Sequence, residues 1–335
     1  MNGRERILAR LAHNPVDRVP LMPITMMFAG DTAGIPYGEY ARRAERLVEA
    51  QCRTAEVFGF DYVSAISDPA RETSDLGGKI EWFDNQPPAI VESEALLSDK
   101  TRLLQLPEPS SFCGPRMSDR LEAVRQLRSR VGPELAVEGW VEGPCALSSD
   151  FRGLSTLMTD FADDPGFVEE LFTYVVQFEI AFATRQVEAG ADLIGIGDAA
   201  ASLVGPRIYQ RLVLPFEQKL IQGIQATGTK VRLHICGNTR RLLSAMGTSG
   251  AELIDLDHFS PVAEARAAMG PDQVLLGNLD PVRALRDASP QEVSTSIAAC
   301  WSAAAPNYIV GVGCEIPRGT PPANVHALRE FAETH

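Results

Sequence analysis

The fold is indicated by one short apolar run, Asp192-Leu193-Ile194-Gly195-Ile196-Gly197, and by the helical pattern that follows it from about Pro206. The same order of an apolar run, a turn and a helical pattern recurs to the end of the chain. It predicts further strands at residues 230–236, 253–256, 274–279 and 308–312. Several intervening helices begin near a proline, which the first helical turn accepts because its N–H groups have no internal partner. Such repeated βα units are typical of a parallel sheet covered by helices.

The N-terminal half adds three predicted strands, at residues 19–24, 61–66 and 136–141. Residues 79–83 and 89–92 flank a turn-forming segment and predict an inserted β-hairpin, and an amphipathic helix is expected near the N-terminus. Eight strands, nearly all followed by a helix, favour a closed (β/α)8 TIM barrel over an open doubly wound sheet. We therefore expect one α/β domain that spans residues 1–335.

Composition excludes several function classes. The chain has 45% hydrophobic and 22% charged residues and a formal net charge of −13, which disfavours binding to nucleic acid or to an anionic membrane surface. No run approaches about 18 consecutive apolar residues, and the N-terminus lacks the features of a signal peptide. The six cysteines are scattered, which favours a reducing, cytoplasmic setting in which a cysteine near a histidine is a metal ligand or a nucleophile.

A candidate metal site lies at the predicted strand ends. His234 and Cys236 are two residues apart at the end of the fifth strand, so their side chains point to the same face. Cys314 follows the eighth strand and would reach the same rim of a closed barrel. One imidazole and two thiolates suit Zn²⁺, and three protein ligands leave the fourth position open, as in catalytic zinc sites.

Acidic residues follow three other strands. Asp68, Glu142 and Asp198 come after the second, third and fourth strands, where each one alone could equally cap a helix or lie in a solvated loop. As a group they could supply a fourth zinc ligand, a general base or a substrate contact, and Glu142 and Asp198 are the best placed. Gly195 and Gly197 lack the rest of a dinucleotide-binding motif, so close backbone approach at the barrel mouth explains them better.

Three stretches resemble a known family: His234-Ile235-Cys236-Gly237-Asn238-Thr239, Gly277-Asn278-Leu279-Asp280-Pro281 and the segment from Gly313-Cys314-Glu315 to Val325. They are similar to the uroporphyrinogen decarboxylase superfamily and, within it, to the zinc-dependent corrinoid methyltransferases. The resemblance runs from Arg4 to the last helix. It implies that His234, Cys236 and Cys314 bind Zn²⁺, and that a methyl-corrinoid is presented by a separate corrinoid-binding protein.

The same resemblance implies a mechanism and leaves its direction open. Zinc would activate a small-molecule thiol as the methyl acceptor, with Asp68, Glu142 and Asp198 as candidate catalytic residues. In the opposite direction, a methoxylated substrate or a methylated amine would give its methyl group to the corrinoid protein. A decarboxylase-like lyase that uses Asp68 and a barrel that only binds a ligand are the remaining alternatives. Assembly as a homodimer is left open.

One segment departs from the decarboxylase pattern. The decarboxylases that this chain resembles share an arginine-rich loop after the first strand, and this loop binds the carboxylates of the substrate. Here residues 22–31 contain no arginine, although Asp68 matches the catalytic aspartate of that family. Asp68 alone cannot hold a polycarboxylate, so the sequence disfavours haem-pathway decarboxylation. The methionines and phenylalanine of this loop indicate a more apolar substrate or a corrinoid edge, or ordinary core packing.

Overall fold

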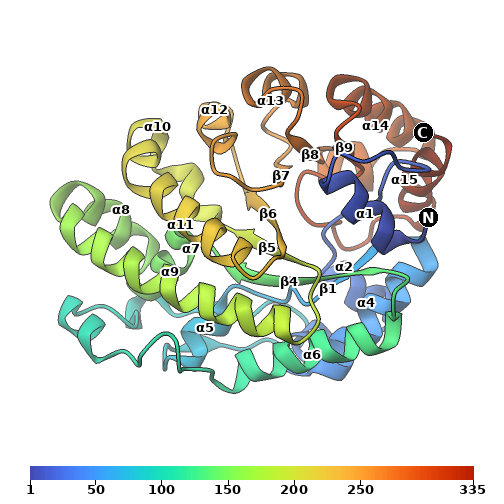
Figure 1. Ribbon diagram of the computed structural model, residues 1–335. Coiled ribbons are helices and arrows are strands. Elements are labelled where there is room, and N and C mark those ends of the chain that lie inside the picture. Colours follow the sequence, from blue (N-terminus) through green and yellow to red (C-terminus); the bar gives the residue numbers. More distant parts are fainter.

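A computed structural model describes residues 1–335 as a curled parallel sheet surrounded by helices (Figure 1). The seven strands pair in the order β1-β4-β5-β6-β7-β8-β9, and every pair is parallel. They are β1 (Tyr62–Ser64), β4 (Ala136–Glu142), β5 (Leu193–Gly197), β6 (Lys230–Ile235), β7 (Leu253–Leu256), β8 (Val274–Leu276) and β9 (Tyr308–Ile309). This α/β architecture is consistent with a TIM barrel.

The helices follow the strands around the outside of the sheet (Figure 1). They are α1 (Gly3–Leu11), α2 (Met27–Ala33), α3 (Tyr37–Arg42), α4 (Ala44–Phe58), α5 (Ala70–Asp75), α6 (Pro115–Val131), α7 (Pro144–Arg152), α8 (Leu154–Asp163), α9 (Pro165–Glu188), α10 (Gly205–Ile208), α11 (Leu214–Gln225), α12 (Leu243–Met246), α13 (Val262–Met269), α14 (Pro290–Ala304) and α15 (Pro322–Thr334). Short 3₁₀ or π turns are η1 (Glu92–Glu94), η2 (Lys100–Gln105), η3 (Ala199–Leu203), η4 (Tyr209–Val213) and η5 (Pro281–Arg286). None of these helices has the length and apolar composition that crossing a bilayer requires.

The segment at residues 20–24 joins the two edges of the sheet. The N–H of Met22 donates to the Val310 carbonyl at 2.8 Å, and the N–H of Asp61 donates to the Leu21 carbonyl at 3.0 Å. A strand was predicted here, but only isolated parallel bridges form, at Leu21 and Ile24. Pro20 and Pro23 explain the difference, because proline has no N–H to continue a ladder.

Short elements precede and follow β1 in the chain. The extended backbone of Arg43 separates α3 from α4. The predicted hairpin is present as two antiparallel strands of two residues each, β2 (Ile80–Glu81) and β3 (Ala89–Ile90). It lies between β1 and β4 in the chain, so it is part of the connection that follows the second predicted strand.

The β5 glycines make room for an aromatic ring inside the curled sheet. Trp140 of β4 pairs with Gly195, and a Cβ atom on Gly195 would lie 2.2 Å from the indole ring. A Cβ atom on Gly197 would lie 3.0 Å from the same ring. The indole therefore occupies space that side chains on β5 would otherwise fill. The sequence predicted close backbone approach at these glycines, whereas the structure places a side chain, the Trp140 ring, against them.

We expect Gly195→Ala to lower the free energy of unfolding by about 1–3 kcal/mol, because the new methyl group would force the Trp140 ring to move. Urea unfolding followed by circular dichroism measures this change. Gly166→Ala in α9 is the control, because the nearest atom to its new methyl group is 3.9 Å away. Equal stabilities of the two variants would show that the close approach to Trp140 does not matter.

Candidate metal centre and cavity

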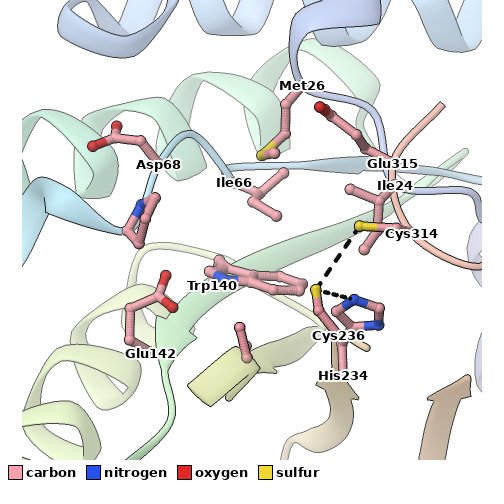
Figure 2. Close-up of a pocket in the computed structure, with 13 residues that line it drawn as sticks. Ile24, Met26, Ile66, Asp68, Trp140, Glu142, His234, Cys236, Cys314 and Glu315 are labelled. Carbon is pink, nitrogen blue, oxygen red and sulfur yellow. Dashed lines mark hydrogen bonds between the residues drawn. The ribbon is translucent and has the colours of Figure 1, made fainter. Parts of the chain in front are cut away.

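Three soft donor atoms meet at the carboxyl end of the sheet. His234 is in β6, Cys236 directly follows the end of this strand, and Cys314 lies in the loop after β9. His234 Nε2 is 2.9 Å from Cys236 Sγ, which is 3.9 Å from Cys314 Sγ (Figure 2). All three donor atoms lie within 4.8 Å of one another. The predicted ligands are therefore brought together, although 78 positions separate the two cysteines.

A buried charge network holds the histidine ring. His234 Nδ1 is 3.0 Å from Asp255 Oδ2 of β7, which leaves Nε2 directed at the sulfur atoms. The same Asp255 oxygen accepts a 2.7 Å hydrogen bond from Arg232, and Arg232 donates to Glu138 at 3.1 Å. Asp255, Arg232 and Glu138 are all at most 1% exposed. A carboxylate behind a ligand histidine fixes the ring orientation and raises its basicity.

The donor set fits zinc. Tetrahedral Zn²⁺ with bonds of about 2.0–2.3 Å places its ligand atoms about 3.5–3.8 Å apart. The observed S–S distance is close to this value, and the N–S distance needs a small outward movement of one side chain. The pKa of Cys314 is lowered, first by its hydrogen bond with Cys236 and then by His234, while the same bond raises the pKa of Cys236.

A cavity of about 160 Å³ opens beside these donors. Its lining is mostly apolar, with three acidic residues among the polar ones (Figure 2). The lining residues are Ile24, Met26, Ile66, Asp68, Pro69, Trp140, Glu142, Gly197, Ala199, His234, Cys236, Cys314 and Glu315. A dry cavity of about 150 Å³ binds benzene, so this one admits a small organic molecule.

Glu142 lines the cavity away from the sulfur atoms. Figure 2 shows the Trp140 ring between Glu142 and the cysteines, and Glu142 is not one of the clustered metal donors. The suggestion that Glu142 is a fourth ligand therefore finds no support in this geometry. Burial raises the pKa of Glu142 to about 8, and the nearby Glu72 carboxyl adds to the effect. At neutral pH this carboxyl holds a proton.

Asp68 also lines the cavity, where it is bound by an arginine that the sequence did not reveal. Arg116 of α6 donates to both carboxylate oxygens of Asp68, at 3.0 and 2.6 Å. The Arg116 guanidinium lies 4.8 Å from the ring centroid of Trp82, which follows β2. Arg116 is 48 positions from Asp68 in the chain, so only the folded structure shows the pair.

Asp198 does not line the cavity. Its Oδ1 accepts a 2.6 Å hydrogen bond from the N–H of Ala146, in the first turn of α7. Burial raises the pKa of Asp198 to about 6, and the carboxyl of Glu217 lies next to it. These contacts favour a role in positioning α7. A catalytic role for Asp198 stays a prediction.

Sequence reasoning missed several residues of this site. Trp140 and Glu315 line the cavity, and Asp255 and Arg232 support His234. One signal was present: Arg232, His234 and Cys236 alternate along one strand, so a charge shares the face of the ligands. A charged residue in an otherwise apolar strand, such as Asp255, is a similar signal, because a buried charge needs a partner nearby.

We expect Glu142→Gln to flatten the pH dependence of stability. The folded pKa of Glu142, about 8, exceeds the ordinary carboxyl value of 4.5. Its contribution to stability is therefore complete below pH 4.5 and falls by several kcal/mol as the pH rises toward 8. Urea unfolding at pH 5 and pH 8 should show a smaller loss for the variant than for the wild type. The exposed Glu188→Gln in α9 should keep the wild-type loss, and identical losses in all three proteins would contradict the assignment.

Comparison with known proteins places the chain in a family. A family model described as Uroporphyrinogen decarboxylase (URO-D) matches residues 2–335. The chain is 30% identical to the methylcobamide:CoM methyltransferase MtbA of Methanosarcina mazei, over 99% of this chain and 98% of that protein. It is 25% identical to the methylcobamide:CoM methyltransferase MtaA of Methanosarcina barkeri, over 97% and 96% of the two chains.

More distant matches agree with this placement. The uroporphyrinogen decarboxylase of Streptomyces avermitilis is 25% identical over 90% of this chain and 84% of that protein. A solved structure, a methyltransferase from Methanosarcina mazei, matches the fold with a TM-score of 0.85 at 24% identity, and covers 100% of this chain and 99% of that one. The chain is an enzyme of the uroporphyrinogen decarboxylase family and belongs to its methyltransferase branch.

Proposed function

We propose that this enzyme transfers a methyl group between a corrinoid, carried by a separate protein, and a small molecule, in the first instance a thiol. The observation that carries the proposal is the cluster of His234, Cys236 and Cys314 beside a small, mostly apolar cavity. Relatives named methylcobamide:CoM methyltransferases, similar over nearly the whole chain, support the same reaction. The proposed metal is zinc, which suits the donor set.

Zinc, when bound, would lower the pKa of a coordinated substrate thiol so that the thiolate is present at neutral pH. His234 would hold its place among the ligands because Asp255 fixes its Nδ1. Cys236 and Cys314 would add two soft donors, and the cavity lies on the open side of the cluster. The chain thus supplies the ligands, their orientation and room for one small substrate.

The proposed transfer is a nucleophilic displacement. The substrate sulfur attacks the methyl carbon of the methyl-corrinoid, an S–C bond forms, and the C–Co bond breaks. The electron pair of that bond stays on cobalt, and the thiol proton passes to solvent or to a carboxylate. Ile24, Ile66 and Trp140 would favour this step because their apolar surface excludes water, which would otherwise solvate and weaken the thiolate.

One observation favours a second candidate, transfer in the opposite direction. Removal of a methyl group from an ether or an amine needs a proton for the leaving oxygen or nitrogen. Glu142 lines the cavity and holds a proton at neutral pH because burial raises its pKa to about 8. A protonated carboxyl in such a place is suited to act as a general acid. The methyl donor would then be a small ether or amine, and the corrinoid would be the acceptor.

A decarboxylase-like lyase that uses Asp68 is less well supported. Asp68 is held by two hydrogen bonds from Arg116, which leaves its charge already compensated. No lysine or arginine lines the cavity, and a polycarboxylate substrate needs such partners. A cavity of about 160 Å³ also cannot enclose a tetrapyrrole.

Exposed apolar residues around the mouth support docking of a corrinoid-bearing partner. Six large hydrophobic residues of the chain are exposed, and three of them lie in the segments that follow β5, β7 and β8. Leu203 lies in η3 after β5, Phe259 between β7 and α13, and Val282 in η5 after β8. Phe259 is 56% exposed, and the neighbouring His258 packs against Gly313 in the loop that carries Cys314. Apolar groups at this rim would cover the flat face of a corrin.

The metal assignment predicts about one zinc per chain in the purified enzyme, as measured by elemental analysis. Cys236→Ser and Cys314→Ser should each lose most of the zinc and at least about 100-fold of the rate of thiol methylation by methylcobalamin, because each removes one of three ligands. Cys113→Ser is the matched control, since Cys113 lies outside the cluster, in the loop before α6, and its thiol hydrogen-bonds with Ser118 of α6. A wild type without zinc, or variants that keep it, would refute the proposed mechanism.

The docking surface predicts a separate effect. The double variant Leu203→Ser, Phe259→Ser should raise KM for methylcobalamin about tenfold while zinc content stays unchanged, because neither residue contacts the metal cluster. Leu104→Ser is the control, because Leu104 is 89% exposed and lies beside α9 in a hollow that shares no residue with the cavity. An unchanged KM in the double variant would remove this surface from the proposal.

A further inference from the structure

The ionisable groups that line the cavity restrict the charge that a substrate can carry. Three carboxyl groups line the cavity, from Asp68, Glu142 and Glu315, and no lysine or arginine does. Glu315 directly follows Cys314, so one carboxyl lies beside the proposed metal, and Figure 2 shows Asp68 and Glu142 on the other side of the cavity. A substrate whose sulfur reaches the metal would therefore place its remaining atoms between acidic groups.

Four arginines near the cavity residues are already bonded to carboxylates. Arg116 is paired with Asp68, and Arg318, which is near Glu315, donates to both carboxylate oxygens of Asp31. Arg71 is buried and paired with Glu72. Arg232 lies 5.9 Å from the Trp140 ring centroid and is bonded to two carboxylates. None of these guanidinium groups is left free to receive a substrate anion.

The remaining wall is apolar and aromatic. Ile24, Ile66 and Met26 form one side, and the Trp140 ring forms the other (Figure 2). Such surroundings solvate an anion poorly, whereas an aromatic face attracts a cation. Glu142 shows the same cost, because burial raises its pKa to about 8. An anionic substrate group would meet the same desolvation penalty, with no cation in the wall to offset it.

We propose that the small-molecule substrate of this site carries a neutral or cationic end group, and that a wall which is apolar and offers no free cation discriminates against anionic thiols. The inference rests on the proposed methyl transfer and adds the chemical class of the substrate. The acidic net charge of the whole chain, −13, acts in the same direction because it repels anions at long range. The substrate is also small, since the cavity holds a molecule of about the size of benzene.

A series of three thioethers tests the charge preference directly. The compounds CH₃–S–CH₂–CH₂–X, with X as sulfonate, hydroxyl or ammonium, are the methylated products of three thiols that differ only in end charge. Calorimetric titration of the metal-stripped enzyme at low ionic strength measures their dissociation constants without catalysis. We expect the sulfonate to bind at least tenfold more weakly than the hydroxyl compound, a difference of about 1.4 kcal/mol, and the ammonium compound to bind at least as tightly.

Two variants connect the preference to the wall. Met26→Lys introduces a cation into the cavity and should bring the sulfonate compound to equal or tighter binding than the hydroxyl compound. Asp68→Asn leaves Arg116 without its carboxylate partner and should tighten binding of the sulfonate compound, which keeps the test open if Met26→Lys fails to fold. Sulfonate binding as tight as that of the hydroxyl compound in the wild type would overturn the inference.

The thiols themselves separate this inference from the proposed function. With methylcobalamin as donor, 2-mercaptoethanol and cysteamine should be methylated at a higher kcat/KM than 2-mercaptoethanesulfonate. If the sulfonate is the preferred acceptor and zinc is present, the charge preference is wrong and the methyl transfer stands. If zinc is absent and no thiol reacts, the proposed function fails, while the thioether titrations still decide the preference.

Discussion

The structure depends on one buried arginine, Arg232, and on the two carboxylates that compensate it. Glu138 comes from β4 and Asp255 from β7, so the pair of contacts spans the inside of the curled sheet. A charge this deeply buried is tolerated only when it is paired, and loss of one partner costs about 3–5 kcal/mol. Because Asp255 also holds His234, the orientation of the proposed zinc ligand is coupled to the packing of the barrel interior.

A second constraint is space. Trp140 takes the volume that Gly195 and Gly197 leave free, and its ring then forms a wall of the cavity. The small residues on β5 thus shape the site without contacting a substrate. The ring also separates Glu142 from the cysteines, so the carboxyl and the soft donors face one cavity from different sides. This separation suits a proton-transferring group that is not a metal ligand.

Local periodicity was sufficient to predict which residues share one face of a strand and one rim of the sheet. Alternation along residues 230–236 placed His234 and Cys236 on one face, and the count of βα units placed Cys314 on the same rim, where the structure has it. The partners of these residues depend on which strands become neighbours. Asp255 and Arg116 were therefore not predicted, because their partners, His234 and Asp68, are 21 and 48 positions away in the chain. The first strand was overestimated, because Pro20 and Pro23 interrupt its hydrogen bonding.

The cavity combines features that have one physical origin. Exclusion of water raises the pKa of Glu142 and Glu315, and it would equally strip a thiolate of the hydrogen bonds that make it a poor nucleophile in solution. Carboxyl groups in such a place are protonated or nearly so at neutral pH, and add hydrogen-bonding capacity with little charge. The soft metal ligands therefore favour a sulfur atom, and the lining of the cavity restricts the chemical group that this sulfur carries.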